Sequence, residues 1–476
     1  MVHITMMCNL FNRTILFAIM CFTLSVNAQE VEIDSLKAGE HNITSIKDFM
    51  KQSEWHFHSR TFFMATLNEG KSKDDYTLAQ GAGIGLLTAP IKGFQLGVSG
   101  YFIFNLASSN LEKPDPITGL SNRYELGQYD LNNHLNKKDL DRLEALFLRY
   151  TYRKQSITVG RMELQTPFMN MQDGRMRPTI EEGVWLKLSP HKKITINGGY
   201  IWSVSPRSTI EWFKISESVG IYGQGVNTDG TKSNYKNNIE SKGFAMLNLS
   251  VKPTKNLEIN IWDGYFDNVM NTALIEIKNE HVISKNQLKL YEHIMYIHQN
   301  AVGNGGNGNQ SKTYINKGAQ ANVISGRIGI KNKKLDWNVN FTHITKDGRY
   351  LMPREWGRDP FYTFIARERN EGMGNVNAFS TNFAINLLKQ KLKPSVGYGY
   401  YKLADVTDYK MNKYGMPSYH QLNISASYNF VNFWKGLEIR VLCAGKLNAD
   451  NNVIAPKYYY NKVNMINFNF IIDIKI

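Results

Sequence analysis

The chain has 476 residues, of which 56 are Lys or Arg and 41 are Asp or Glu, so its formal net charge is +15. After the N-terminal segment it has no run of about 18 consecutive apolar residues, which argues against a protein that crosses a membrane with helices. Frequent Tyr, Phe and Gly, together with only 13 Pro and 3 Cys, instead fit a strand-rich protein with many turns.

Residues 1–28 have the features of an export signal. Arg13 ends a short positive region, an apolar stretch covers 14–26, and Val26-Asn27-Ala28 forms a small-x-small cleavage site. A buried or membrane-spanning helix is the alternative, but the apolar stretch is too short to span a bilayer comfortably. The sequence therefore predicts an exported protein.

Export changes the meaning of the cysteines and of the charge. Cys8 and Cys21 would leave with the signal, so Cys443 would remain alone and no internal disulfide is expected. In a cytoplasmic protein the positive excess would suggest a nucleic-acid partner, but in an exported one we expect none. Residues 29–54 show no clear period and are interpreted as a periplasmic N-terminal extension, which leaves 55–476 for the main domain.

Period-two alternation recurs along this domain. In the stretch 335–343, Leu, Trp, Val and Phe share one face, while Asp, Asn and Thr share the other. The last eleven residues, INFNFIIDIKI, alternate in the same way. We therefore predict strands at 56–66, 76–90, 93–104, 143–152, 155–161, 180–189, 193–203, 242–252, 256–266, 272–279, 287–298, 320–331, 335–345, 375–388, 391–403, 419–430, 437–446 and 465–476.

The connections between these strands sort by length. The short ones carry Lys and Pro and fall at 90–93, 152–155, 189–193, 252–256, 331–336, 388–393 and 431–436. The long polar ones lie between them, at 105–142, 161–179, 204–241, 299–319, 346–374, 404–418 and 447–464. Outer-membrane barrels have periplasmic turns at one end and longer extracellular loops at the other.

The fold prediction is therefore an all-β transmembrane antiparallel barrel in a bacterial outer membrane. Its apolar side chains would face lipid and its polar ones a wet lumen. The count is 18 strands. It falls to 16 if the two weakest strands, 272–279 and 287–298, are removed, and both numbers are even, so parity does not choose between them.

A dense group of charges occupies 160–185, GRMELQTPFMNMQDGRMRPTIEEGVW. Solvated side chains on a surface loop are one interpretation. The other is a loop that folds into the barrel and narrows the pore. The run from Gly160 to Trp185, above all RMRPTIEEG at 175–183, resembles the OprD-type outer-membrane porins, and the stretch 354–372 is similar to their seventh loop.

This resemblance implies an 18-stranded porin, often assembled as a homotrimer, with a pore narrowed by its third and seventh loops. It also implies a ladder of basic side chains on one wall, an acidic patch opposite, and passage of small solutes that often bear a carboxylate. The chain differs from the family in ending with Ile476 rather than an aromatic residue. Its other expected contacts are outer-membrane lipid and lipopolysaccharide.

Candidate ladder residues follow from strand parity and from the two loops. Parity places Arg149, Arg327 and Arg440 on inward faces, opposite Leu148, Ile328 and Ile439. The loops and their ends supply Arg161, Arg175, Arg177, Arg354, Arg358, Arg367 and Arg369. The acidic counterparts would be Asp173, Glu181 and Glu182. A guanidinium stays charged at physiological pH and offers forked donors to a carboxylate, but each Arg could equally form a loop salt bridge or contact lipopolysaccharide.

The main prediction is a diffusion porin for small hydrophilic, anionic or carboxylate-bearing solutes, without a catalytic step. No cofactor is expected, and His293 and His298 lack further ligands at metal spacing. One alternative is an outer-membrane barrel enzyme, for which no nucleophile and histidine set was found. The other is a soluble exported β-protein that binds glycans or acts as an adhesin.

Overall fold

The computed structural model describes residues 45–476 except 137, 173, 285–286, 433–434 and 451–454. The predicted signal (1–28), most of the predicted extension and Asp173 therefore lie outside the described residues. The described end of the extension forms a short helix, α2 (Ile46–Gln52), and the first strand begins at Glu54, one residue before the predicted boundary. No helix in the described part of the chain is long and apolar enough to cross a membrane.

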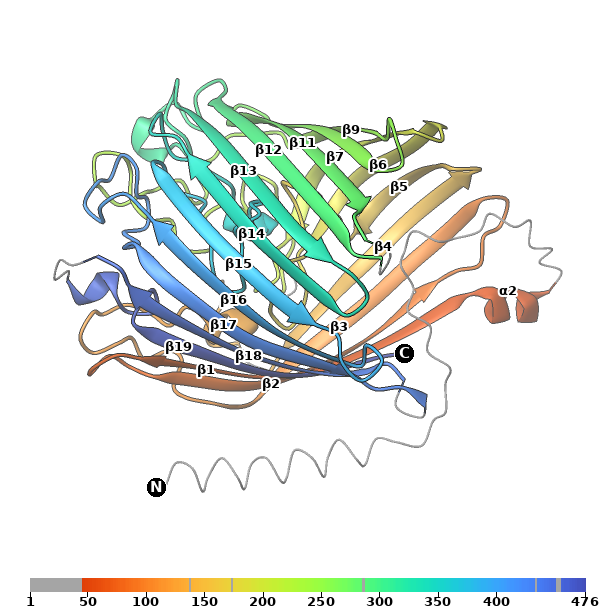
Figure 1. Cartoon of the computed structure of the whole chain (residues 1–476), viewed down its shortest axis with the longest axis horizontal. Coiled ribbons are helices and arrows are strands. Elements are labelled where there is room, and N and C mark those ends of the chain that lie inside the picture. Colours follow the sequence, from red (N-terminus) through yellow and green to blue (C-terminus); the bar gives the residue numbers. More distant parts are fainter. Residues whose placement is uncertain (1–44, 137, 173, 285–286, 433–434, 451–454) are drawn as a thin grey trace.

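Eighteen long antiparallel strands form a closed barrel, as predicted (Figure 1). Each long strand pairs with the next, and β1 pairs with β19 to close the wall. The strands are β1 (Glu54–Asn68), β2 (Asp75–Leu87), β3 (Phe94–Ser108), β4 (Leu140–Tyr152), β5 (Gln155–Met162), β6 (Ile180–His191), β7 (Ile194–Ser205), β9 (Phe244–Val251), β10 (Leu257–Phe266), β11 (Met270–Val282), β12 (Lys289–Ala301), β13 (Gln320–Lys331), β14 (Leu335–Ile344), β15 (Val376–Ile385), β16 (Leu392–Lys402), β17 (Tyr419–Asn429), β18 (Leu437–Asn448) and β19 (Met465–Lys475).

The two strands with the weakest sequence signal are present as β11 and β12, so the count is 18 and not 16. A further strand of two residues, β8 (Phe213–Lys214), pairs with the end of β7 inside a long loop. It extends the sheet locally beside the end of β7, and the barrel still closes through the pairing of β1 with β19.

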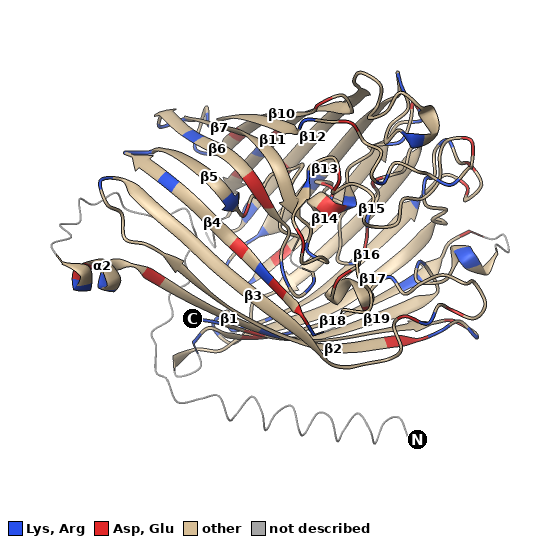
Figure 2. Ribbon diagram, turned by 180° about the vertical axis from the view of Figure 1, so that it is seen from behind, with Lys and Arg blue, Asp and Glu red and all other residues tan. Residues whose placement is uncertain are grey.

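The wall has the inverted polarity that the alternation predicted. On β19, Ile466 is 47% exposed, whereas Asn467, Asn469 and Asp473 are buried on the opposite face. Because successive side chains of a strand point to opposite faces, the apolar half faces outward on every such strand. Figure 2 shows most of each strand without charge and many charged positions in the loops.

The two ends of the barrel differ as expected. One end has the short turns, including 153–154 and 192–193. The other end has nine connections, named here L1 (69–74), L2 (109–139), L3 (163–179), L4 (206–243), L5 (267–269), L6 (302–319), L7 (345–375), L8 (403–418) and L9 (449–464). L1 and L5 are short although they lie at the long-loop end.

The interior is not uniformly polar, because the long loops pack an apolar core against the inner wall. Trp356 of L7 is 1% exposed, and its ring centroid lies 4.9 Å from those of Phe244 and Phe266 on β9 and β10. Phe168 of L3 packs edge-on against Phe244 at 6.3 Å. Aromatic pairs of this kind contribute about 0.5–1.5 kcal/mol each beyond their buried area, so L3 and L7 are fixed inside the barrel.

Charged side chains fasten the seam where the barrel closes. Nε of Arg60 on β1 donates to Oδ1 of Asp473 on β19 at 2.6 Å, and both side chains are almost fully buried. Arg440 on β18 also donates to Asp473, and His58 lies 3.1 Å from the same carboxylate. Three neighbouring strands thus share one buried carboxylate.

Candidate functional site

L3 enters the barrel because its backbone is bonded to the wall and to L7. Nη1 of Arg60 donates to the carbonyl of Arg175 at 2.7 Å, and the amide of Leu164 donates to Oε2 of Glu181 at 3.1 Å. The amide of Asn170 donates to the carbonyl of Trp356 at 2.9 Å. L3 is therefore the inward-folded constriction loop that the sequence predicted.

L7 lies against the inner wall formed by β16, β17 and β19. The carbonyl of Ala366 accepts hydrogen bonds from Gln421 at 2.6 Å and from Asn423 at 2.9 Å, both on β17. The Tyr401 hydroxyl donates to the carbonyl of Thr363 at 2.9 Å. Nε of Arg367 donates to Asn467 at 2.8 Å, so L7 reaches across to β19.

Five cations from different parts of the chain form a cluster, in which four lie around the phenol of Tyr124 and the fifth, Arg207, lies close to Arg175. This basic cluster consists of Arg123 of L2, Arg175 of L3, Arg207 of L4, Arg367 of L7 and Lys446 of β18. The Arg123 guanidinium lies 5.5 Å from the Tyr124 ring. Nζ of Lys446 donates to the carbonyl of Arg367 at 2.6 Å, and Nη1 of Arg207 donates to the carbonyl of Gln172 at 3.3 Å.

The electrostatics of Tyr124 show how strongly these charges act. Burial raises the pKa of a phenol, yet the charges of Lys446, Arg123 and Arg367, with Arg175, outweigh burial and leave the pKa of Tyr124 below its ordinary value. Burial lowers the pKa of both Arg175 and Arg207 to about 9, and a neighbouring arginine contributes in each case. Since these values stay above neutral pH, the cluster remains positive.

Parts of the cluster have unused hydrogen-bond donors. Among the described residues, neither Nε of Arg175 nor the hydroxyl of Tyr124 has a hydrogen-bond partner, although both atoms are buried. L2 packs directly on Arg175, because a Cβ placed on Gly127 would lie 2.8 Å from that Nε. Buried donors without acceptors are costly, and an anion among them would lower that cost.

Two acidic groups lie close to the cluster. Glu125 of L2 is buried and accepts hydrogen bonds from Thr66 and Asn122 at 2.6 Å each. Glu368 of L7 is also buried, and neither of its carboxylate oxygens has a hydrogen-bond partner within the described ranges. Burial raises the pKa of Glu368 well above its ordinary value, and the carboxylate of Asp359 adds to the rise.

The structure places the three arginines selected by parity on inward faces. Leu148 and Ile328 are 50% and 53% exposed on the opposite faces. Arg149 donates to Thr158 at 3.2 Å, and Arg327 donates to the carbonyl of Tyr362 at 2.8 Å. Arg440 belongs to the closing seam. These three lie on separate parts of the wall, and none of them belongs to the basic cluster.

The predicted arginines of L7 have different environments. Arg367 belongs to the basic cluster. Arg354 and Arg369 both pair with Glu371, and the Arg354 guanidinium lies 3.8 Å from the Tyr414 ring. Arg358 is exposed and lies 4.6 Å from the Phe364 ring. The carboxylate of Glu371 thus partly neutralises Arg354 and Arg369 within L7.

The register contradicts two of the predicted pore residues, because Arg161 and Glu182 face the outer wall. Arg161 shares its strand face with Ile157 and Val159, which are exposed on the outer wall. It pairs with Glu182 at 3.3 Å, and its guanidinium lies 4.4 Å from the Trp212 ring. Because β5 continues its alternation to this end, both charges point away from the lumen.

The remaining predicted residues lie near L3 but outside the cluster. Glu181 is buried and holds the start of L3, so it does not form an open acidic patch with Glu182. Arg177 is buried and donates to the carbonyl of Leu140. Beside it, Arg142 of β4 donates to the carbonyl of Pro178 at 2.7 Å and to Glu144 at 2.8 Å.

Sequence reasoning missed Arg123, Arg207, Lys446, Arg60 and Arg142. Strand parity could have identified Lys446, because it lies on the same face of its strand as Arg440. Arg142 was hidden by a β-bulge, since Leu143 and Leu146 both face outward although they are three residues apart. Arg123 and Arg207 lie in loops, where the sequence has no period that gives direction.

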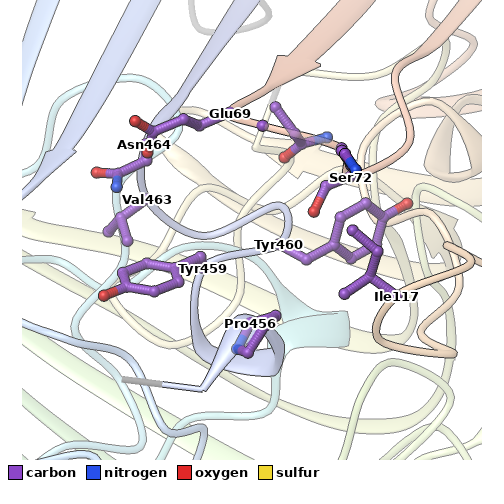
Figure 3. A pocket seen from close by; sticks show the side chains of 11 residues that line it. Glu69, Ser72, Ile117, Pro456, Tyr459, Tyr460, Val463 and Asn464 are labelled. Carbon is purple, nitrogen blue, oxygen red and sulfur yellow. The ribbon is translucent and has the colours of Figure 1, made fainter. Parts of the chain in front are cut away.

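A separate pocket of about 370 Å³ lies between L1, L2 and L9 (Figure 3). Ile117, Pro456, Tyr459, Tyr460 and Val463 supply much of its lining, with Glu69 and Asn464 among its polar groups. None of the basic-cluster residues lines it, so it is distinct from the candidate site.

Comparisons with known proteins agree with this architecture. Residues 47–355 match the family described as outer membrane porin, OprD family. Pseudomonas aeruginosa OpdK, in a structure with vanillate, is 11% identical and superposes with a TM-score of 0.68, covering 90% of this chain and 99% of its own.

Two further solved structures have the same fold. Pseudomonas aeruginosa OccK8 (OprE) is 14% identical with a TM-score of 0.69, over 90% of this chain and 99% of its own. Acinetobacter baumannii OccAB4 is 15% identical with a TM-score of 0.69, over 89% and 98%. No curated protein matches the sequence significantly. With well over half of its length matched by the family and its 18-stranded barrel closed, the chain belongs to the OprD family of outer-membrane porins.

Proposed function

We propose that this channel passes small hydrophilic anions in preference to cations, with carboxylate-bearing solutes favoured. The observation that carries the proposal is the basic cluster, in which four loops and the wall bring five cations together, four of them around Tyr124. Its buried donors on Arg175 and Tyr124 have no acceptor among the described residues. A carboxylate supplies both the charge and the acceptor oxygens that this arrangement lacks.

The physical basis is the field of fixed charges in a confined space. Low-dielectric walls focus that field and raise the local concentration of counter-ions. Guanidinium groups bind carboxylates through paired donors, and a series of weak sites lets an anion enter and still leave. The inward arginines on the wall, such as Arg149 and Arg327, would extend the series beyond the cluster. OpdK, which shares the fold, is described in complex with vanillate, an aromatic carboxylate.

The proposal is tested by reversal potentials in planar bilayers. The wild-type channel should prefer chloride over potassium in a salt gradient. Arg123→Gln and Arg175→Gln should each lower that preference severalfold, because each removes a charge from the cluster. Arg161→Gln is the matched control, since Arg161 faces the outer wall, and it should leave the preference unchanged.

A cation-preferring wild-type channel would contradict the proposal, and so would an unchanged preference in both cluster variants. Solute chemistry is tested in liposomes with a matched pair, benzoate and benzamide. Benzoate should enter faster than its neutral analogue through the wild-type channel, and the difference should shrink in Arg175→Gln. Equal rates of entry for benzoate and benzamide would contradict the preference for carboxylates. The preference for anions over cations would still be decided by the reversal potentials.

A further inference from the structure

The short helix α2 exposes apolar side chains at the short-turn end of the barrel. Ile46 is 84% exposed and Met50 is 44% exposed, and no residue of α2 is buried. Ile46 and Met50 are four residues apart, so they lie on the same side of the helix. Lys47 and Lys51 have the same spacing and form a second, basic stripe.

The helix is attached to the short-turn end of the barrel. Its N-terminus is capped by Ser45, whose Oγ accepts from the amide of Asp48 at 3.1 Å. At its other end, Oγ of Ser53 accepts from the amide of Ala89 in the β2–β3 turn at 3.0 Å. Figures 1 and 2 show α2 beyond the end of β1, at the short-turn end of the barrel.

The wall next to α2 is a lipid-facing belt. Trp55 and Phe57, on the outward face of β1, are 51% and 42% exposed. Ile91 and Phe94, in and after the β2–β3 turn, are 51% and 49% exposed. Exposed aromatic residues at a barrel end mark the level of the lipid headgroups. Because α2 is bonded to that turn and runs directly into β1, the helix lies next to this belt.

The length of α2 also points to an external contact. A helix of seven residues is far below the roughly 12–15 residues at which isolated helices become even marginally stable in water. Its cap supplies one stabilising interaction, but no residue of α2 is buried by the described part of the chain, and Ile46 is almost fully exposed. Burial of that stripe in a membrane interface would supply what is missing.

We propose that α2 is an interfacial anchor on the periplasmic leaflet of the outer membrane. Ile46 and Met50 insert among the acyl chains beside Trp55 and Phe57, while Lys47 and Lys51 contact the phosphates of anionic phospholipids. A helix with an apolar stripe and flanking lysines is suited to this position, and its binding depends on the charge of the lipid surface. The anchor is independent of the solute that the channel passes.

A fluorescent probe on α2 tests the anchor in the intact barrel. Cys443 is the only cysteine in the described part of the chain, so Cys443→Ser gives a background for Met50→Cys labelled with an environment-sensitive fluorophore. The control is Lys333→Cys, in an exposed turn at the same end of the barrel. In vesicles of phosphatidylcholine and phosphatidylglycerol with bromine on the acyl chains, the Met50 probe should be quenched severalfold more than the Lys333 probe.

Two further comparisons complete the test. The double variant Lys47→Gln with Lys51→Gln should reduce quenching of the Met50 probe in vesicles with phosphatidylglycerol. With both lysines present, quenching should also be weaker in vesicles of phosphatidylcholine alone. Equal quenching at Met50 and Lys333 would overturn the anchor. Strong quenching at Met50 that changes neither when the lysines are replaced nor when the anionic lipid is left out would overturn the phosphate contacts. Conductance in each variant confirms that the barrel is intact.

Discussion

At the scale of single residues, buried charges hold this barrel together wherever a carboxylate meets arginines. Asp473 is the clearest case, because Arg60, Arg440 and His58 all contact it from neighbouring strands. Removing one partner of a buried ion pair leaves the other charge uncompensated, which costs far more than an exposed pair contributes.

Asp473→Asn should therefore lower the free energy of unfolding by about 3–5 kcal/mol, since Arg60 loses its charged partner in a buried site. The measurement is urea unfolding in detergent micelles, followed by tryptophan fluorescence. Glu217→Gln is the control, because Glu217 pairs with Lys214 at 3.6 Å on an exposed loop. A loss for Asp473→Asn no larger than that of the control would show that the seam is hydrated.

Lys413 of L8 is a second buried charge, with a different environment. Its Nζ lies 4.6 Å from the rings of Tyr235 and Tyr314 and 5.6 Å from that of Tyr414, and it has no hydrogen-bond partner among the described residues. Burial lowers the pKa of Lys413 to about 7, although Glu371 and Glu355 oppose the shift and Arg349 and Arg354 add to it.

This shift makes stability depend on pH in a definite direction. Between pH 7 and about 10.4 the unfolded chain keeps a proton on Lys413 that the folded chain has released, so the free energy of unfolding rises with pH. The expected slope is about 1.4 kcal/mol per pH unit. Urea unfolding at pH 7.5 and 9 should show a rise in the wild type and in Lys410→Met, an exposed control, and Lys413→Met should reduce the rise by this amount. A smaller rise should remain in Lys413→Met, because burial also lowers the pKa of Lys462 to about 7. The same slope in Lys413→Met would assign it to another group.

At the scale of elements, each strand has one face for lipid and one for the lumen. Ile424, in the middle of β17, is 54% exposed on the outer face, and its neighbours Gln421 and Asn423 bond to L7 on the inner face. His420 shares the outer face but lies at the rim, where it contacts the Tyr398 hydroxyl at 2.8 Å.

Depth in the membrane should decide the effect of a charge on this face. Ile424→Arg should cost about 2–4 kcal/mol of stability in lipid vesicles, whereas His420→Arg, near the interface, should cost about 0–1 kcal/mol. Folding titrations in phosphatidylcholine vesicles measure both variants. Equal costs would mean that Ile424 does not lie near the bilayer centre.

At the scale of the whole molecule, the protein is an outer-membrane channel without a catalytic step, and its positive charge is unevenly used. Many of its positive side chains form ion pairs, such as Arg354 with Glu371, or lie at exposed turns. The basic cluster concentrates unpaired charge where L2, L3, L4 and L7 meet the wall. Under the proposed function, selectivity would depend on a field that acts over a distance as well as on contacts.

Salt should therefore weaken the selectivity of the channel. The Debye length falls from about 10 Å at 0.1 M to about 3 Å at 1 M, so the preference for chloride over potassium should drop clearly between these concentrations. Reversal potentials at a fixed gradient ratio measure the change. A preference that does not change with salt would mean that ions are selected only by direct contact with the cluster.

The sequence by itself determined the barrel. Period-two alternation identified all eighteen strands, including β11 and β12, and the order of short and long connections identified the two ends. This works because the pleat turns successive side chains to opposite faces, so the pattern is local. The resemblance to the OprD-type porins also pointed to L3 and L7, and Arg175 of L3 and Arg367 of L7 belong to the basic cluster.

Only the tertiary structure decided which charges meet. Arg161 and Glu182 lie on the outward faces of β5 and β6, because both strands keep their alternation up to the ends of L3. The bulge beside Leu143 reversed the parity that would have placed Arg142. Arg123 and Arg207 reach the cluster through loops that have no period, and their positions follow from packing against residues distant in the sequence. Local alternation therefore fixes the faces of the wall, while non-local contacts of the loops fix the site inside it.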